Sequence, residues 1–153
     1  MSTILVVANL PSGNCVKLLD AVVRGASNDA IEGIDVVVRE PLSADAADVL
    51  VCSGIIVGTT ENFGYMSGLI KDFYERIYYP CLEKTEALPC ALYVKGGLDG
   101  QGAKTSMERI ITGLRWKPIR DTLVMKGEFR ESFVDQCEEL GMQMAAGLEA
   151  GIY

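Results

Sequence analysis

Five short runs of the chain are mainly apolar, and segments with helical periodicity separate them. The runs are Thr3–Ala8, Ile34–Val38, Ser53–Gly58, Cys90–Lys95 and Ile119–Met125. A strand that is apolar on both faces is buried on both sides. Strands of this kind that alternate with helices predict a parallel sheet with right-handed crossovers. We therefore predict an α/β fold, a three-layer doubly wound five-stranded parallel sheet.

The segments between the runs carry signals for helix ends. The first helix follows the first run and is expected to end at Gly25. A short helix is expected over Ala44–Leu50, with the Ser43 hydroxyl as its cap. A third helix is expected to begin at about Ser67 and to stop at Pro80.

Two more helices follow the fourth and fifth runs. The last helix is expected to begin near Ser132, because Ser132 and Asp135 have the spacing of a capping box. The apolar positions that these two helices should bury are Met107, Ile110, Ile111, Leu114, Phe133, Cys137, Leu140, Met144 and Leu148.

The length and composition bound the organisation of the chain. At 153 residues, 49% of them hydrophobic and 23% charged, one domain over residues 1–153 is expected, without repeats or linkers. No apolar run approaches the roughly 20 residues that span a bilayer, and no basic segment precedes the first run. A cytoplasmic location without membrane insertion is therefore expected.

Charge and reactive side chains exclude several function classes. The net charge of −7 and the pI near 4.6 argue against a nucleic-acid surface. The chain has no histidine, which excludes triads, general bases and metal sites built on imidazole. No metal site is expected. Five scattered cysteines without Cys-x-x-Cys spacing are interpreted as reduced thiols, at positions Cys15, Cys52, Cys81, Cys90 and Cys137.

The first loop, Asn9–Asn14, joins a buried strand directly to an amphipathic helix. It has Ser12, Gly13 and Asn14 at the point where the helix begins. Backbone N–H groups and short polar side chains can converge there on an anion, and the helix dipole favours negative charge. The segment predicts a phosphate site without a lysine. Alternatively it is a plain turn, because Ser, Asn and Gly favour turns for conformational reasons.

Two further loops follow the third and fourth runs. The second loop, Thr59–Met66, contains Phe63 and Tyr65, which a flat ligand would explain. The alternative is that these aromatic rings cover the sheet edge or an oligomer contact. The third loop, Gly96–Gly102, has four glycines, which permit a close approach of backbone to ligand. In doubly wound sheets ligands bind beyond the carboxyl ends of the strands, so the three loops predict one site.

Spacing or residue type excludes three common kinds of site for phosphate groups. The third loop is close to a P-loop, but Ala103 separates Gly102 from Lys104. No Gly-x-Gly-x-x-Gly follows the first run, which excludes a dinucleotide fingerprint. A phosphoacceptor domain would need acidic residues where Ala8–Asn9 and Gly58–Thr59 stand.

The three loops together resemble the flavodoxin-like superfamily over essentially the whole chain. Ser12-Gly-Asn-Cys15 matches the phosphate loop of that family, with Cys15 in place of the usual hydroxyl residue. The stretch Glu61–Phe73 looks like the flavin loop of the small NAD(P)H-dependent FMN reductase and quinone reductase branch. Gly96–Gly102 is similar to its third flavin loop. Thr59–Thr60 departs from the family, where proline is common.

The resemblance implies a strand order of 2-1-3-4-5 and FMN as the cofactor, with NAD(P)H as electron donor. It implies an oxidoreductase that passes hydride or electrons through flavin N5 to a quinone, free flavin or protein acceptor, so that the cofactor carries the chemistry. No catalytic side chain is assigned. Phosphate contacts are expected from Ser12–Cys15, ring contacts from Thr60–Tyr65, and N–H contacts to the ring's polar rim from Gly96 and Gly97. The full set expected to bind the cofactor is Asn9, Pro11, Ser12, Gly13, Asn14, Cys15, Thr59, Thr60, Glu61, Asn62, Phe63, Gly64, Tyr65, Gly96, Gly97 and Asp99.

Two other functions stay open at this point. One is a flavodoxin-type one-electron carrier without NAD(P)H activity of its own, and the other is a flavin-free assembly protein with the same fold. Proteins resembling the reductase branch often pair or tetramerise, so a homo-oligomer is possible. Tyr78, Tyr79 and Trp116 are the interface aromatics that we expect in that case.

Overall fold

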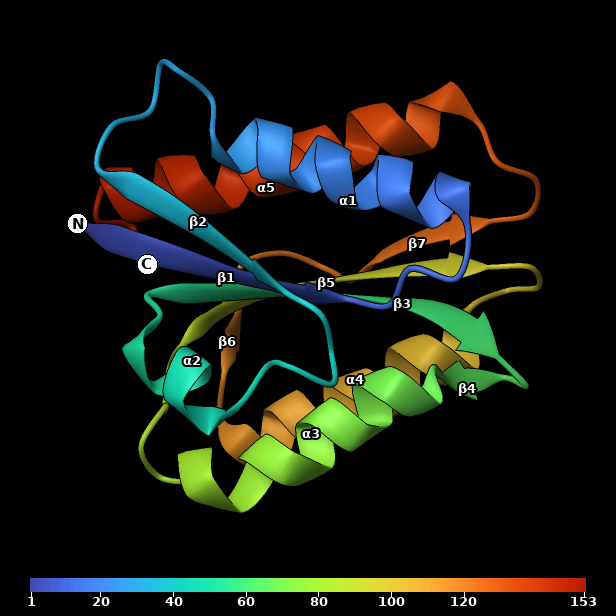
Figure 1. Cartoon of the computed structure of the whole chain (residues 1–153), viewed down its shortest axis with the longest axis horizontal. Helices are drawn as coiled ribbons and strands as arrows, with labels where there is room; N and C mark the ends of the chain where they lie inside the picture. Colours follow the sequence, from blue (N-terminus) through green and yellow to red (C-terminus); the bar gives the residue numbers. More distant parts are fainter.

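One sheet runs through the molecule, with helices on both of its faces (Figure 1). The computed structural model describes residues 1–153. Its elements are β1 (Ser2–Ala8), α1 (Gly13–Ala26), β2 (Ile34–Arg39), α2 (Ala46–Val51), β3 (Gly54–Asn62), β4 (Tyr65–Met66), α3 (Gly68–Cys81), β5 (Pro89–Gly96), α4 (Gln101–Leu114), β6 (Lys117–Pro118), β7 (Leu123–Lys126) and α5 (Glu131–Glu149). Helices α1 and α5 cover one face, and α2, α3 and α4 cover the other. The predicted three-layer α/β architecture is confirmed.

The strand order is β2-β1-β3-β5-β6, and every pair along this path is parallel. This is the predicted order, because β5 is the fourth predicted strand. The fifth predicted strand, Ile119–Met125, is divided. Residues 119–122 form no strand. The short strand β6 lies just before them and β7 just after them, and both pair with β5. Between β6 and β7, the Thr122 hydroxyl donates to the Glu108 carboxylate on α4 at 2.7 Å.

A hairpin replaces part of the predicted second loop. Strand β3 continues through Asn62, and β4 returns antiparallel to it, so that Asn62 pairs with Tyr65. The prediction of a loop over the whole of Thr59–Met66 is therefore wrong. The apolar pattern ends at Gly58, which left no signal for the polar extension of the strand.

One predicted helix start and two predicted helix caps are wrong. Ser43 lies in a turn, and α2 is capped by Asp45, whose side chain accepts from the Asp48 N–H while the Asp48 side chain accepts from the Asp45 N–H. This reciprocal pair is a full capping box. Helix α5 begins at Glu131, next to the predicted start near Ser132, but its N-cap residue Arg130 makes no side-chain cap bond, so the predicted capping box of Ser132 and Asp135 is wrong.

Two predicted helix stops are also wrong, each by a short distance. Pro80 lies inside the last turn of α3, which ends at Cys81. A proline there loses only one backbone hydrogen bond of a turn that is already ending. Helix α1 continues past Gly25 to Ala26. Gly25 has a packing role instead, because a Cβ at this position would collide with the carbonyl group of Glu138 on α5.

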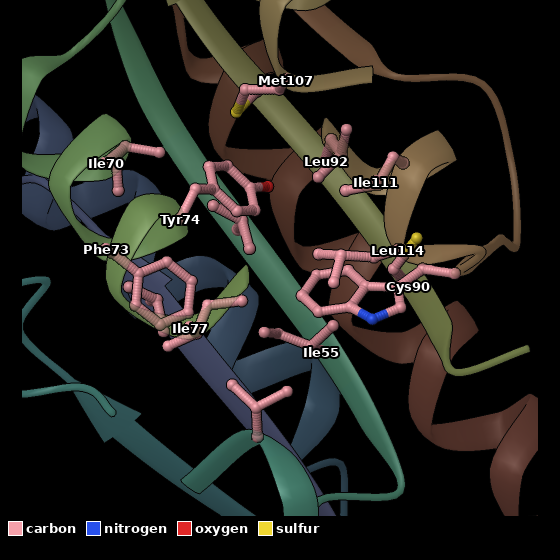
Figure 2. Close-up of a cluster of buried hydrophobic side chains, with 14 of the residues drawn as sticks. Ile55, Ile70, Phe73, Tyr74, Ile77, Cys90, Leu92, Met107, Ile111 and Leu114 are labelled. Carbon is pink, nitrogen blue, oxygen red and sulfur yellow. The ribbon is translucent and has the colours of Figure 1, made fainter. Parts of the chain in front are cut away.

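The core consists of two apolar clusters, one on each face of the sheet. Figure 2 shows the cluster under α3 and α4, where the Tyr74 ring reaches from α3 toward Leu92 and Ile111. The Tyr74 hydroxyl is buried and has no hydrogen-bond partner, and burial raises its pKa. The second cluster fills the space between the sheet and the pair α1 and α5.

Helices α1 and α5 pack backbone to backbone at two glycines. A Cβ at Gly141 on α5 would collide with the Val22 carbonyl oxygen on α1, and Gly25 makes the reciprocal contact. Small residues allow this approach, and a methyl group would force the helices apart. The contact fixes the position of α1, whose first turn belongs to the first loop.

Gly141→Ala should therefore lower the free energy of unfolding by about 1–3 kcal/mol, the usual cost of overpacking. Gly68→Ala is the matched control, because Gly68 is in the first turn of α3 and has no atom within 4 Å of a Cβ. That variant should be neutral or up to about 1 kcal/mol more stable. Urea denaturation measures both. Equal effects of the two substitutions would mean that the helices are not in close contact.

Candidate functional site

The carboxyl ends of β1, β3 and β5 bring the three loops to one edge of the sheet (Figure 1). The parallel register pairs Ala8 with Gly58 and Gly58 with Tyr93. Residues that follow these positions therefore emerge side by side, as the sequence predicted for the three loops. Some of the predicted residues are exposed at this edge, and others are bonded within the protein.

The first loop exposes the start of α1. Residues 10–14 are exposed, Pro11 among them, and Ser12 is the N-cap of the helix. The Ser12 hydroxyl accepts from the Cys15 N–H at 3.3 Å and donates to the Cys15 sulfur at 3.4 Å. Cys15 itself is buried. The N–H groups of Gly13 and Asn14 have no partner within the helix, so they are the free donors of this loop.

Asn9 and Thr59 hold the first two loops in place. The buried Asn9 amide donates to the Thr60 hydroxyl at 2.9 Å and accepts from the Thr60 N–H at 3.1 Å. The buried Thr59 hydroxyl accepts from the Ser67 N–H at 2.9 Å, which anchors the start of α3. Both side chains, predicted to bind cofactor, are engaged within the protein. These bonds position the two loops.

The tip of the second loop is a two-residue turn in a strained conformation. Phe63 and Gly64 have φ values of 53° and 68°, which is the geometry of a type I′ hairpin turn. For a residue with a Cβ, the left-handed conformation costs about 1–2 kcal/mol. The Phe63 side chain is also fully exposed, at 107%, and Tyr65 is 41% exposed. The hairpin requires this backbone conformation, but glycine or asparagine would adopt it at lower cost, and the exposed Phe63 ring adds no packing to the fold.

The third loop and the start of α4 contact the hairpin of β3 and β4. The Leu98 N–H donates to the Glu61 carboxylate at 3.3 Å. Asp99 accepts from the Gln101 N–H at 3.0 Å, at the start of α4. A Cβ at Gly102 would collide with the Gly64 carbonyl group, so the hairpin tip lies directly on α4. This contact was not predicted, because it depends on the position of a helix relative to a turn.

Two glycines of the third loop differ in how open they are. Gly96 ends β5 and is buried, and its carbonyl oxygen accepts from the Gly127 N–H at 2.9 Å. Gly97 is exposed and would have no atom within 4 Å of a Cβ. A ligand can therefore approach the backbone at Gly97.

Exposed apolar side chains gather at the same edge. They come from the three loops, from the segment after β2 and from the first turn of α3. The set is Leu10, Leu42, Phe63, Tyr65, Leu69 and Leu98. Grouped apolar exposure of this kind marks a binding surface more often than single exposed residues do. A groove of about 230 Å³ beside the first loop is lined by Leu10, Leu42 and Leu69 among others.

Tyr93 and Lys95 on β5 belong to this edge and were missed in the sequence. The Tyr93 ring lies where a side chain on Gly58 would be, and its buried hydroxyl has no partner, so burial raises its pKa. Beside it is a cavity of about 10 Å³ lined by Asn9, Cys15 and Lys95 among others. Lys95 donates to the Gly127 carbonyl oxygen at 2.6 Å. Only the strand register, which places Gly58 opposite Tyr93, could have revealed this arrangement.

Other hollows lie away from this edge. A cavity of about 440 Å³ is at the amino ends of the strands, and a groove of about 260 Å³ lies on α3 and α4 beside Tyr78 and Tyr79. Trp116, predicted as an interface aromatic, is buried and donates to the Thr85 hydroxyl at 2.8 Å. That prediction is wrong, because the indole completes the core. No group of three metal-ligating side chains is present, and no helix has the length and apolarity to cross a bilayer.

The cysteines are not arranged for thiol chemistry. All five are free, and burial raises the pKa of Cys52, Cys90 and Cys137 to about 12 each. Burial also raises the pKa of Cys81. A thiol with a pKa of about 12 is ionised in roughly one molecule in ten thousand at about pH 8, and only the thiolate reacts.

In the folded protein at about pH 8, Cys90 and Cys137 should therefore resist alkylation, and both should be labelled once urea unfolds the chain. Peptide mass mapping after a timed pulse of iodoacetamide measures this. Labelling of Cys90 at the same rate with and without urea would contradict the burial described above.

The comparisons with known proteins agree on the architecture. No family model matches the chain. A flavodoxin from Aquifex aeolicus is 29% identical over 115 residues, which is 74% of this chain and 60% of that relative's length. A flavodoxin from the domain Archaea superposes with a TM-score of 0.80 over 94% of this chain and 96% of that one, at 16% identity. The fold is flavodoxin-like. A protein described as a flavodoxin, WrbA-like, from Agrobacterium tumefaciens superposes with a TM-score of 0.73 at 13% identity, covering 98% of both chains.

Proposed function

We propose that the flavodoxin-like edge binds FMN and that the protein is an NAD(P)H-dependent oxidoreductase with a quinone, free flavin or protein as acceptor. The observation that carries the proposal is Phe63. This ring is fully exposed on a backbone with a φ of 53°, a combination that opposes folding. A strained, exposed aromatic residue at a ligand-binding edge is explained when the ring contacts a flat ligand.

The phosphate end of FMN fits the first loop. The free N–H groups of Gly13 and Asn14 lie at the positive end of the α1 dipole, and the Asn14 side chain is exposed. The Ser12 hydroxyl caps the helix by accepting from the Cys15 N–H, and its single proton, now donated to the Cys15 sulfur, would turn to the phosphate instead. Cys15 is not a phosphate contact in this proposal, because its thiol is buried and its N–H is bonded to Ser12.

The ring end of FMN fits the second and third loops. Phe63, Tyr65 and Leu98 supply exposed apolar surface, and the open backbone at Gly97 supplies a donor for the polar rim of the ring. When bound, FMN supplies the hydride and electron transfer that this histidine-free chain cannot perform itself. The chain's tasks are to hold the phosphate, stack on the ring and leave one ring face accessible to donor and acceptor.

Partners and location follow from the same proposal. A cytoplasmic setting suits five unpaired cysteines, since oxidising compartments favour disulfides. The exposed Tyr79 on α3 is the aromatic residue that we retain for contact between copies of the chain, with Tyr78 beside it at a ring distance of 5.3 Å. Residues 1–153 form one domain in this proposal.

A second candidate function is a one-electron carrier that depends on a separate reductase. It is favoured by the similarity to proteins named flavodoxin. The deciding experiment adds NADH or NADPH, without oxygen, to the FMN-loaded protein and follows the visible flavin absorbance. Bleaching by the nicotinamide alone supports the oxidoreductase. Bleaching only after a flavodoxin reductase is added supports the carrier. A protein that takes up no FMN would be the flavin-free assembly protein instead.

Phe63→Asn separates binding from folding. Asparagine suits the first position of a type I′ turn, so this variant should unfold with a free energy about 1 kcal/mol higher than the parent. Loss of the ring should weaken FMN binding about 5- to 100-fold. Phe63→Tyr keeps the ring and should bind FMN like the parent. Fluorescence titration and urea denaturation of the apo-protein measure the two effects. Unchanged FMN affinity in Phe63→Asn would remove the ring contact from the proposal.

A further inference from the structure

The hydroxyl group of Tyr93 is buried at the carboxyl edge of the sheet and has no hydrogen-bond partner in the chain. The ring lies directly against Gly58 on the neighbouring strand, where a Cβ would collide with the ring carbon that carries the hydroxyl. A phenylalanine would fill the same space without burying a polar group. Because a buried hydroxyl without a partner opposes folding, a tyrosine at this position is explained by a partner from outside the chain.

A small cavity with polar walls lies beside this hydroxyl. Its volume is about 10 Å³, close to the roughly 10–15 Å³ that one water molecule needs. Two of the lining side chains have donors to spare. The Asn9 amide uses one of its two N–H donors on the Thr60 hydroxyl, and the Lys95 ammonium uses two of its three on carbonyl oxygens. With the Tyr93 hydroxyl, the cavity can therefore give a water molecule the three bonds that buried water typically makes.

The same cavity lies against the inner side of the first loop. Cys15 and Leu18, from the start of α1, form one of its walls. Cys15 is buried, whereas Gly13 and Asn14 just before it are exposed and have free N–H groups. A water molecule in the cavity is therefore separated from the proposed phosphate position by the first turn of α1 alone.

We propose that Tyr93 is a phosphate-positioning residue that acts through one water molecule in this cavity, an inference that rests on the proposed FMN binding. The Tyr93 hydroxyl donates its proton to the water, and the water donates one of its own protons to a phosphate oxygen. The side chains of Asn9 and Lys95 hold the water in place. The consequence is selectivity, because a flavin without a phosphate, such as riboflavin, gains nothing from this contact.

The test compares the dissociation constants of riboflavin and FMN, measured by fluorescence titration of the apo-protein. Tyr93→Phe removes the hydroxyl and keeps the ring against Gly58. The ratio of the riboflavin constant to the FMN constant should fall about tenfold, with riboflavin bound as by the parent. Tyr74→Phe is the matched control. It also removes a buried hydroxyl without a partner, but one that lies among the apolar side chains of the other cluster (Figure 2). Its ratio should equal that of the parent, and urea denaturation checks that both variants are folded.

The other outcomes overturn the inference in distinguishable ways. A parental ratio in Tyr93→Phe removes the role of Tyr93 and leaves the proposed FMN function intact. Equal losses of riboflavin and FMN affinity would mean that the hydroxyl supports the loops and not the phosphate. A fall of the ratio in Tyr74→Phe as well would assign the effect to any lost core hydroxyl. A crystal structure of the FMN complex without a water molecule on the Tyr93 hydroxyl would remove the bridge. A parent protein that binds neither flavin overturns the proposed function, and the inference with it.

Discussion

The parallel pairing of β1, β3 and β5 is the constraint on which the rest of the structure depends. Parallel strands end at the same edge, so the loops that follow them must meet there. Because these strands are apolar on both faces, helices must cover both sides of the sheet. The backbone contact of α1 with α5 then fixes the start of α1 next to the ends of β1 and β3. Side-chain bonds complete the edge, since Asn9 joins the first loop to Thr60 and Glu61 joins the hairpin to Leu98.

The architecture could be predicted because it follows from long apolar patterns. Five strands and the covering helices derive from that signal, whereas the strand order was implied by the resemblance to the flavodoxin-like superfamily. Helix ends could not be predicted as well, because caps depend on which side chains reach the backbone. Asp45 and Asp48 cap each other, so the nearby Ser43 is not used. Trp116 was misplaced for a similar reason, since the sequence does not reveal that it completes the core or that Thr85 accepts from its buried indole N–H.

The location of the candidate site could be predicted from the sequence, but the role of each of its residues could not. The three loops were identified from glycines, small polar residues and aromatics. Asn9 and Thr59 look like ligand-binding residues in the sequence, yet their side chains hold the loops together. Conversely, Tyr93 under Gly58 and the contact of Gly102 with Gly64 require the strand register and the helix position. Phe63 was predicted to lie in a loop and to contact a flat ligand, and the structure adds its full exposure and its left-handed backbone conformation.

The central claim is that the three loops form one FMN site at the carboxyl edge of the sheet. The most direct measurement follows the backbone amide NMR signals of isotope-labelled apo-protein during a titration with FMN. The account predicts that the signals of Gly13 and Asn14, of Phe63 and its neighbours, and of Gly97 shift together to saturation at one equivalent. Shifts confined to the α3 and α4 groove or to the amino-end cavity, or no shifts at all, would contradict it.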